Sequence, residues 1–221
     1  MEIITWNMQG AKASTEAAWN TGVAPLVPER SEVVCCLQEC GSVPASATLV
    51  DANGQGVKRY RWGGTTRKPG RWIVWYESDE GGGRCNLAIV SPPDLEPRTP
   101  MLVEAADEPR KRPALGAHFD GTAVFSIHAI SPNGPDARGL LEAVSKAVPS
   151  GTPWVVAGDF NREPGIDGYH CHGPAEATYN ANTKATKKLD WCVTSASHPH
   201  LQGTVMKEIQ RSDHYPVAYA M

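Results

Sequence analysis

The sequence predicts an α/β protein in which two β-sheets pack face to face and helices cover their outer faces. Short apolar runs of strand length recur along the 221 residues, separated by Gly, Pro and Asp turn signals. Two longer segments have the pattern of helices, too few to form the core by themselves. A sandwich of two sheets is ordinary at this length, so we expect residues 1–221 to form a single domain.

The first half of the chain contains four expected strands and one expected helix. The helix runs from Ser14 to Leu26, with Ser14 or Thr15 placed to accept a hydrogen bond from its first turn. The Gly-rich and polar segment 51–70 is expected to form a loop. The expected strands are 2–6, 32–38, 72–76 and 86–90, the last two separated by a turn at residues 81–83.

The second half continues with strands and one helix. Asp120-Gly121 lies between two apolar runs, 113–118 and 123–127, and is a strong signal for a tight hairpin turn. A helix is expected from Asp136 to Val148. Further strands are expected at 154–157, 189–193 and 217–220.

Charge restricts the kinds of partner. The formal net charge of −3 argues against a surface that coats DNA without specificity. A nuclease remains possible, because a local basic patch can hold a phosphate backbone. The basic residues cluster at Arg67-Lys68, at Arg110-Lys111-Arg112, and at Lys184, Lys187 and Lys188.

Membrane and disulfide signals are weak. No apolar stretch is long enough to span a bilayer, and a strand already begins at Glu2, so no signal peptide is expected in this chain. The six cysteines lack the paired Cys-x-x-Cys spacing of zinc sites. Cys35 and Cys36 are expected to be buried thiols, and a disulfide among Cys40, Cys85, Cys171 and Cys192 stays open.

Polar side chains collect where apolar runs end. Gly158-Asp159-Phe160-Asn161 follows an apolar strand and places a carboxylate and a carboxamide on one side of the chain. Asn7, Glu39, His128, Asp190 and Asp213-His214 also follow or close apolar runs. If these ends share one edge of the sandwich, they form a site for a metal and a phosphate ester.

The residue types fit phosphodiester hydrolysis. Oxygen ligands suit Mg²⁺, and Glu39 is the best candidate, although a lone Glu at a strand end is also an ordinary surface charge. An imidazole needs a carboxylate to orient it as a base, and Asp190 could serve His214 in this way. The alternatives are a core histidine for His128 and a turn former for Asp190.

Two arginines are candidates for binding phosphate oxygens. Arg84 and Arg112 could each present a planar guanidinium to two oxygens, and Arg112 is fixed by the Pro113 that follows it. Residues 170–172, His-Cys-His, look like a fragment of a metal site but lack partners at ligand spacing. We expect them to be loop residues.

The motifs together resemble the endonuclease/exonuclease/phosphatase superfamily, which includes DNase I, exonuclease III and inositol polyphosphate 5-phosphatases. Longer blocks resemble the catalytic B subunits of cytolethal distending toxins, from residue 3 to residue 219. The blocks are Trp6–Gly10, Ser14–Asn20, Leu37–Pro44, Gly82–Ser91, Arg112–Gly116, Gly158–Pro164 and Arg211–Val217.

The resemblance implies a four-layered α/β/β/α sandwich with two central mixed β-sheets, as in DNase I. It implies a DNA-nicking endonuclease that depends on Mg²⁺, with Mn²⁺ or Ca²⁺ as substitutes. Glu39 would bind the metal with Asn7 and Asp213 close by, and Arg84 and Arg112 would contact DNA phosphates. The catalytic residues would be His128, His214, Asp190, Asp159 and Asn161.

The resemblance also has consequences for metal number and partners. Gln9 stands where the abasic-site nucleases carry an Asp ligand, which favours one metal and argues against abasic-site repair. The toxin subunits work with delivery or binding subunits, so a secreted toxin acting on DNA in the target-cell nucleus is implied. Nothing in the sequence points to a particular oligomeric state. The chain is shorter than the toxin subunits, mainly between Gly165 and Lys187 and before Arg211.

Two other functions compete with the nuclease. A phosphoinositide phosphatase would use the same catalytic set on the same fold, because each reaction attacks a phosphorus held by metal and imidazole. The inositol phosphatases add basic loops that this sequence does not identify. A binding module without activity is disfavoured, because the set of polar residues at the strand ends is complete.

Overall fold

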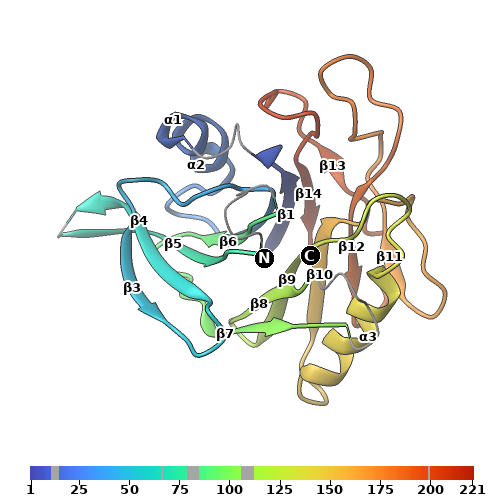
Figure 1. Ribbon diagram of the computed structural model, residues 1–221, viewed down its shortest axis with the longest axis horizontal. Helices are drawn as coiled ribbons and strands as arrows, with labels where there is room; N and C mark the ends of the chain where they lie inside the picture. The colour runs from blue at the N-terminus through green and yellow to red at the C-terminus, as the bar shows by residue number, and fades with distance from the viewer. Residues whose placement is uncertain (11–14, 66, 79–84, 106–111, 199) are drawn as a thin grey trace.

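Two β-sheets pack face to face in the computed structural model, and each carries a helix on its outer face (Figure 1). The structure describes residues 1–10, 15–65, 67–78, 85–105, 112–198 and 200–221. The four layers follow the order helix, sheet, sheet, helix, which confirms the predicted α/β/β/α sandwich.

Among the described residues, the first sheet has eight strands in the order β13-β14-β1-β2-β6-β5-β4-β3. Its centre is the parallel pair β1 and β2, and the other neighbours are antiparallel. The strands are β1 (Glu2–Asn7), β2 (Val33–Gln38), β3 (Thr48–Ala52), β4 (Lys58–Thr65), β5 (Lys68–Tyr76), β6 (Leu87–Ser91), β13 (Thr204–Val205) and β14 (Val217–Ala220).

In the part of the chain that the structure describes, the second sheet has six strands in the order β11-β12-β10-β9-β8-β7. The parallel pair β9 and β10 lies at its centre, as β1 and β2 do in the first sheet. The strands are β7 (Arg98–Val103), β8 (Ala114–Phe119), β9 (Thr122–His128), β10 (Trp154–Asp159), β11 (His170–His172) and β12 (Asp190–Thr194).

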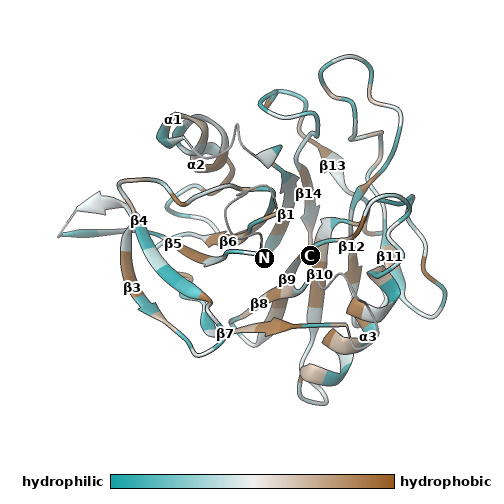
Figure 2. Ribbon diagram, viewed as in Figure 1, coloured by the Kyte–Doolittle hydropathy of each residue, from teal (hydrophilic) through white to brown (hydrophobic). Residues whose placement is uncertain are grey.

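Alternation along the strands separates an inner core from two outer cores. Ile3 and Val34 of the first sheet pack with Val124 and Val155 of the second, so this cluster lies between the sheets. Ile4, the next residue after Ile3, belongs to the cluster on the outer face of the first sheet. Figure 2 shows hydrophobic residues along the strands of both sheets. The buried area on both faces of the central strands therefore holds the four layers together.

A helical segment covers the outer face of the first sheet. It consists of α1 (Glu16–Ala18), a π-helical turn (Trp19–Val23) and α2 (Ala24–Leu26). Thr15 caps it by accepting a hydrogen bond from the backbone N–H of Ala18 at 3.0 Å. A Cβ at Gly22 would lie 2.7 Å from the Trp6 ring, so glycine is required where the helical segment crosses β1.

The second helix, α3 (Ala137–Ala147), covers the outer face of the second sheet. Its apolar face packs Leu140, Leu141 and Val144 on strand residues such as Phe125. This spacing of one and three residues places the three side chains on one side of the helix. The predicted helix at 136–148 is thus confirmed to within one residue at each end.

The prediction of a loop over residues 51–70 is wrong. This segment includes the end of β3, all of β4 and the start of β5, which extend the first sheet as a hairpin. Trp62 is buried in the outer core, and the Arg61 guanidinium lies 3.4 Å from the Trp72 ring centroid. A Cβ at Gly70 would lie 1.9 Å from the Gly63 carbonyl oxygen. Glycine therefore lies where β4 and β5 approach too closely for a side chain.

Other differences from the sequence are smaller. Residues 170–172 form the edge strand β11 because they pair with β12, which corrects the expected loop. Strands β7 and β13 were not predicted, and β6, β8 and β12 are each shifted by one residue. The expected turn at 81–83 lies outside the described residues. Asp120 and Gly121 form the predicted tight turn, both with positive φ. In the described part of the chain, no helix is long and apolar enough to cross a bilayer.

Candidate active site

The candidate site lies where the central strands of both sheets end. In the second sheet, Asp159 is paired with His128 on one side and with Asp190 on the other, so three titratable residues form a row. In the first sheet, Asn7 is paired with Gln38, which precedes Glu39. The parallel strands β9 and β10 end at the same edge, as do β1 and β2, and the antiparallel strand β12 begins at the edge where β10 ends. This register therefore brings the predicted residues together.

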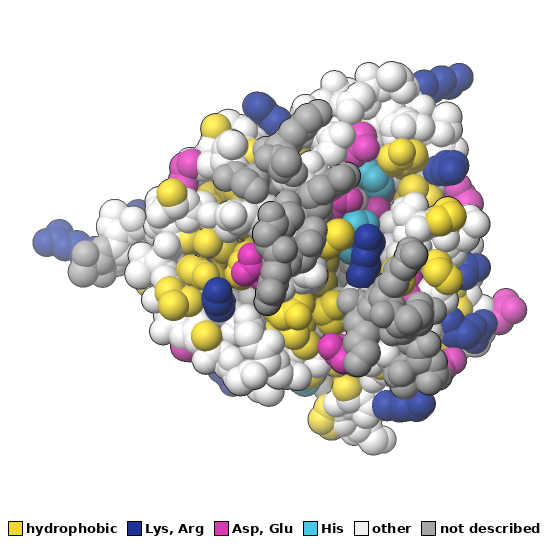
Figure 3. Space-filling view, in the orientation of Figure 1, with side chains coloured by type: hydrophobic (Ala, Val, Ile, Leu, Met, Phe, Trp, Pro, Cys, Tyr) yellow, Lys and Arg dark blue, Asp and Glu magenta, His cyan; other side chains and the backbone are white. Residues whose placement is uncertain are grey.

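A cleft of about 650 Å³ lies over these strand ends. Figure 3 shows histidine and acidic side chains next to one another on this face, with basic side chains nearby. Both sheets contribute to the lining, together with the loops that follow them. The lining includes Asn7, Gln9, Glu39, Cys85, Arg112, His128, Asp159, Asn161, Tyr179, Lys187, Leu189, Asp213 and His214.

Asp159 is the centre of the site. Its Oδ2 accepts a hydrogen bond from Asn7 Nδ2 at 3.0 Å, which joins the two sheets across the cleft. Its Oδ1 accepts the backbone N–H of Asn161 at 2.8 Å. Burial raises the pKa of Asp159, and the His214 and His128 imidazoles act against that rise. The carboxylate is thus fixed on both oxygens before any substrate binds.

Asn161 is held by its own side chain. Its Nδ2 donates to the Ala129 carbonyl oxygen at 2.8 Å, and its φ is 51°. Asparagine tolerates this left-handed backbone better than most residues. Asn161 follows Asp159 by two residues, and in the structure this segment forms a turn in which the Asn161 backbone N–H bonds to the Asp159 carboxylate.

His214 is oriented by a chain of hydrogen bonds. Its Nδ1 lies 2.8 Å from Asp190 Oδ2, and the same oxygen accepts the Thr178 hydroxyl at 2.5 Å. Thr178 Oγ1 in turn accepts the backbone N–H of Leu189 at 3.3 Å. Because a carboxylate only accepts, Nδ1 of His214 carries the hydrogen and Nε2 faces Asp159. The predicted pairing of Asp190 with His214 is therefore present.

The two histidines differ in charge. Burial alone would lower the pKa of His214, but the charge and hydrogen bond of Asp190, with Asp159 and Asp213, raise it to about 10. Burial lowers the pKa of His128 to about 4, against the opposing charge of Asp159. At neutral pH these shifts favour the imidazolium form of His214 and the neutral form of His128.

The two imidazoles approach Asp159 together. Nε2 of His128 lies 3.7 Å from Asp159 Oδ2 and 3.7 Å from Glu39 Oε1. Nε2 of His214 lies 3.8 Å from the same Asp159 oxygen. Nδ1 of His128 is buried and has no hydrogen-bond partner among the described residues. His128 lines the cleft, and its Nε2 is the ring atom that lies near the other polar side chains of the site.

Glu39, Asn7 and Asp213 line the cleft as oxygen-bearing side chains. The Glu39 side chain is 20% exposed, and its Oε1 accepts Asn7 Nδ2 at 3.3 Å. Asn7 Oδ1 accepts the backbone N–H of Gln9 at 3.0 Å, and a carbonyl oxygen keeps a second lone pair. Carboxylate and carbonyl oxygens are the donors that Mg²⁺ prefers, so this donor set fits the ion.

A different group is more compact. Among the described residues, donor atoms of Asp159, Asp190 and His214 lie within 4.8 Å of one another. Asp190 Oδ2 is already occupied by His214 and Thr178, and a cation there would displace the hydrogen on Nδ1. Asp190 and His214 in this group are therefore already hydrogen-bonded to each other, whereas the Glu39 carboxylate is more exposed.

Of the two arginines predicted to contact phosphate, the structure describes Arg112. Arg112 lines the cleft and donates from Nη1 to the Ala129 carbonyl oxygen at 3.1 Å, which fixes one side of its guanidinium. Arg84 lies outside the described residues.

Sequence reasoning missed the hairpin that follows Thr178. Thr178, Tyr179 and Lys187 belong to the site, and the sequence indicates only Lys187, as part of a basic cluster. An isolated Thr-Tyr in a polar segment gives no periodic signal, so the sequence offers little to find it.

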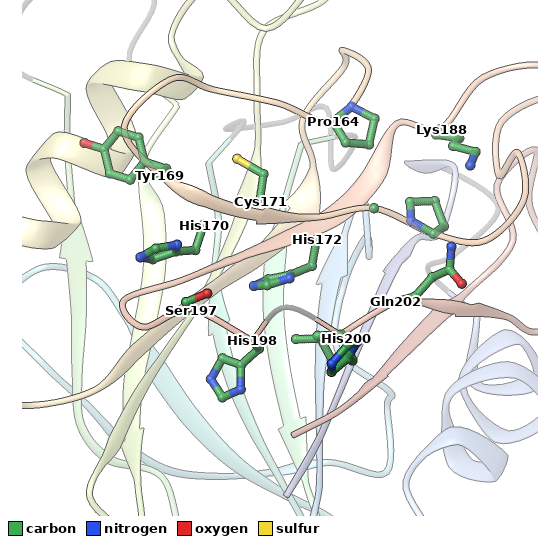
Figure 4. Close-up of a pocket in the computed structure, with 13 residues that line it drawn as sticks. Pro164, Tyr169, His170, Cys171, His172, Lys188, Ser197, His198, His200 and Gln202 are labelled. Atoms are coloured by element: carbon green, nitrogen blue, oxygen red, sulfur yellow. The ribbon is translucent and has the colours of Figure 1, made fainter.

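A second hollow lies beside β11 and contains four histidines, as Figure 4 shows. Thr194 Oγ1 donates its single hydrogen to the Ala196 carbonyl oxygen at 2.5 Å. His172 Nε2, at 2.8 Å from Thr194 Oγ1, must therefore donate its hydrogen to that oxygen. His172 is thus a satisfied structural histidine.

The chain is similar in sequence to a known family and to two bacterial toxin components. The Endonuclease/Exonuclease/phosphatase family matches residues 4–214. The B subunit of the Escherichia coli cytolethal distending toxin is 31% identical, over 97% of this chain and 89% of that protein. A homolog of this toxin component from Salmonella typhi is also 31% identical, over 99% of this chain and 88% of that protein.

Solved structures agree with the sequence relatives. A chain of the Haemophilus ducreyi cytolethal distending toxin is similar with a TM-score of 0.84 at 26% identity, covering 99% of this chain and 97% of that one. CdtB, described as the biologically active subunit of cytolethal distending toxin, gives a TM-score of 0.83 at 29% identity, covering 99% and 96%. The likeness extends over nearly the whole of each chain.

Proposed function

The chain belongs to the endonuclease/exonuclease/phosphatase family, as a relative of the CdtB components of cytolethal distending toxins, and from this we propose that it is a metal-dependent endonuclease that nicks DNA. One observation carries the proposal. The Nε2 atoms of His128 and His214 both lie within 3.8 Å of Asp159 Oδ2, at the floor of a cleft lined by Glu39 and Arg112. A phosphodiester placed there meets an imidazolium, a neutral imidazole and a guanidinium at once.

The reaction is the attack of water on phosphorus, with one P–O ester bond broken. His128, neutral in the buried site, accepts the proton of the attacking water at Nε2. His214, charged and oriented by Asp190, donates the Nε2 hydrogen to the leaving oxygen or to a non-bridging oxygen. Asp159 and Asn161 hold the water and the phosphate between the two rings.

The metal belongs at the more exposed end of the cleft. Glu39, Asn7 and Asp213 would hold Mg²⁺, with Mn²⁺ or Ca²⁺ as substitutes. When bound, the ion supplies positive charge that offsets the negative charge of the phosphate. Arg112 adds charge from the protein itself, and its contact with the Ala129 carbonyl keeps it at the cleft.

Relaxation of supercoiled plasmid tests the proposal. Purified protein with Mg²⁺ should convert supercoiled to nicked plasmid, and a chelator should stop the conversion. His128→Ala should lower the rate at least ~100-fold, on the scale of losing an acid–base group. If folded wild-type protein leaves the plasmid intact but releases phosphate from a phosphoinositide, the nuclease function is refuted and the phosphatase function takes its place.

Delivery extends the proposal to the cell. The relatives are named as toxin subunits, so the protein would be secreted, join other subunits and act on DNA in the nucleus of a target cell. Co-purification of the protein with other secreted chains from culture medium tests this part. A protein retained in the producing cells and purified without a partner would contradict it.

A further inference from the structure

A hairpin of residues 179–187 forms one wall of the active-site cleft. The backbone N–H of Tyr179 donates to the Lys187 carbonyl at 3.1 Å, and the N–H of Thr186 donates to the Tyr179 carbonyl at 3.0 Å, which close its base. The hairpin is also tied to the segment before β14 that carries His214, because Ala181 N–H donates to the Asp213 carbonyl at 2.9 Å. The side chains at its base are therefore positioned by the same segment as the catalytic imidazole.

Tyr179 presents a half-buried aromatic ring to the cleft. The centroids of the Tyr179 and His214 rings lie 4.9 Å apart, with an angle of 53° between the planes. The tyrosine ring therefore packs against the imidazole, and Tyr179 lines the same cleft as His214. An aromatic surface in that position can stack with any base, whatever the sequence.

Lys187 adds a positive charge on the same wall. Its side chain is exposed and lines the cleft, and the described residues give its ammonium no ion pair. Its neighbour Lys188 lines the histidine hollow instead (Figure 4). The Nζ of Lys188 donates to the Ala175 carbonyl oxygen at 3.1 Å. Adjacent lysines thus serve opposite sides of the chain.

The two cations flank the reacting groups. Arg112 is bonded to the backbone at the end of β9, and Lys187 lies just before β12, with Asp159 on β10 between them. A strand of phosphates laid across β9, β10 and β12 meets Arg112, the catalytic centre and Lys187 in turn.

We propose that Tyr179 and Lys187 form a nucleic-acid contact next to the scissile phosphate, in which Tyr179 stacks on a sugar or base and Lys187 binds the adjacent phosphate. This inference rests on the proposed nuclease function and extends it from one phosphate to a strand. It assigns to the hairpin a role in holding the substrate, separate from the bond-breaking step.

Binding of a short labelled DNA duplex, measured by fluorescence anisotropy across a series of KCl concentrations, tests the inference. Lys187→Gln should weaken binding and reduce the slope of log affinity against log salt by about one. Lys184→Gln makes the same charge change on the hairpin outside the cleft lining, and should keep the wild-type slope. Equal slopes for the two variants would overturn the Lys187 contact.

Tyr179 is tested by a pair of variants in the same assay. Tyr179→Leu removes the ring and should weaken binding about tenfold, whereas Tyr179→Phe should bind like wild type. In plasmid nicking, the loss should appear in KM more than in kcat. A loss in kcat alone would show that Tyr179 only positions His214, and would refute its contact with the nucleic acid.

The binding assay needs no turnover and is run without metal. A wild-type protein that binds duplex but fails to nick plasmid would refute the proposed function and leave the hairpin contact standing. A wild-type protein that nicks plasmid while Lys187→Gln and Tyr179→Leu bind as it does would refute the inference alone.

Discussion

Replacing Asp190 by Asn removes the negative charge that keeps His214 protonated. Nδ1 of His214 lies 2.8 Å from Oδ2 of Asp190, and two unit charges at that distance interact by about 6 kcal/mol at an effective dielectric constant of about 20. This energy corresponds to a pKa change of about four. We therefore expect the pKa of His214 to fall from about 10 to near or below its ordinary 6.5, because burial then acts with little opposition.

The loss of activity should depend on pH in a defined direction. At mildly alkaline pH the Asp190→Asn variant has a neutral His214 and should nick plasmid at least ~100-fold more slowly than wild type. At mildly acidic pH the imidazole is charged again, so the ratio of the two rates should narrow. Initial rates of plasmid nicking across this range give the ratio directly.

A matched variant controls for the chemical change. Asp51→Asn makes the same substitution in an exposed ion pair with Arg59 and should keep the wild-type rate and pH profile. Asp190 Oδ1 is buried without a partner among the described residues, so an amide there costs about 1–3 kcal/mol of stability, and thermal unfolding must confirm a folded variant. A loss of the same size at every pH would refute the charge argument.

The metal ligand, the core and the charged histidine each give a further prediction. Glu39→Gln should raise the Mg²⁺ concentration for half-maximal nicking at least ~10-fold, because one ligand charge is lost, and an unchanged titration would place the ion elsewhere. Trp191→Ala should lower the free energy of unfolding, measured in urea, by about 3–5 kcal/mol. The Trp191 ring is buried and stacked on Phe160, with the ring centroids 3.7 Å apart. A loss below about 1 kcal/mol would contradict this reasoning. In metal-free protein, the stability from the raised pKa of His214 is complete below about pH 6.5 and is lost as pH rises through about 10. Asp190→Asn should remove this decline in the free energy of unfolding with rising pH, measured by urea unfolding. An identical decline in both proteins would assign the decline to another group.

Strand positions could be read from the sequence because their signals are local. Asp159 and His128 close apolar runs, and both prove to be the last residues of their strands. The error over residues 51–70 has a physical cause. Glycine there marks two strands that approach too closely for a Cβ, a feature of the partner strand that the segment itself does not reveal.

The sequence by itself determined which side chains stand at strand ends and which chemistry their types allow, because alternation and turn residues act over a few positions. Only the tertiary structure decided how they meet. Asn7 bonds to Asp159 across 152 residues, and Asp190 rather than Asp213 takes the His214 Nδ1 hydrogen. Register and the packing of one sheet on the other set these contacts, and both depend on strands far apart in the chain.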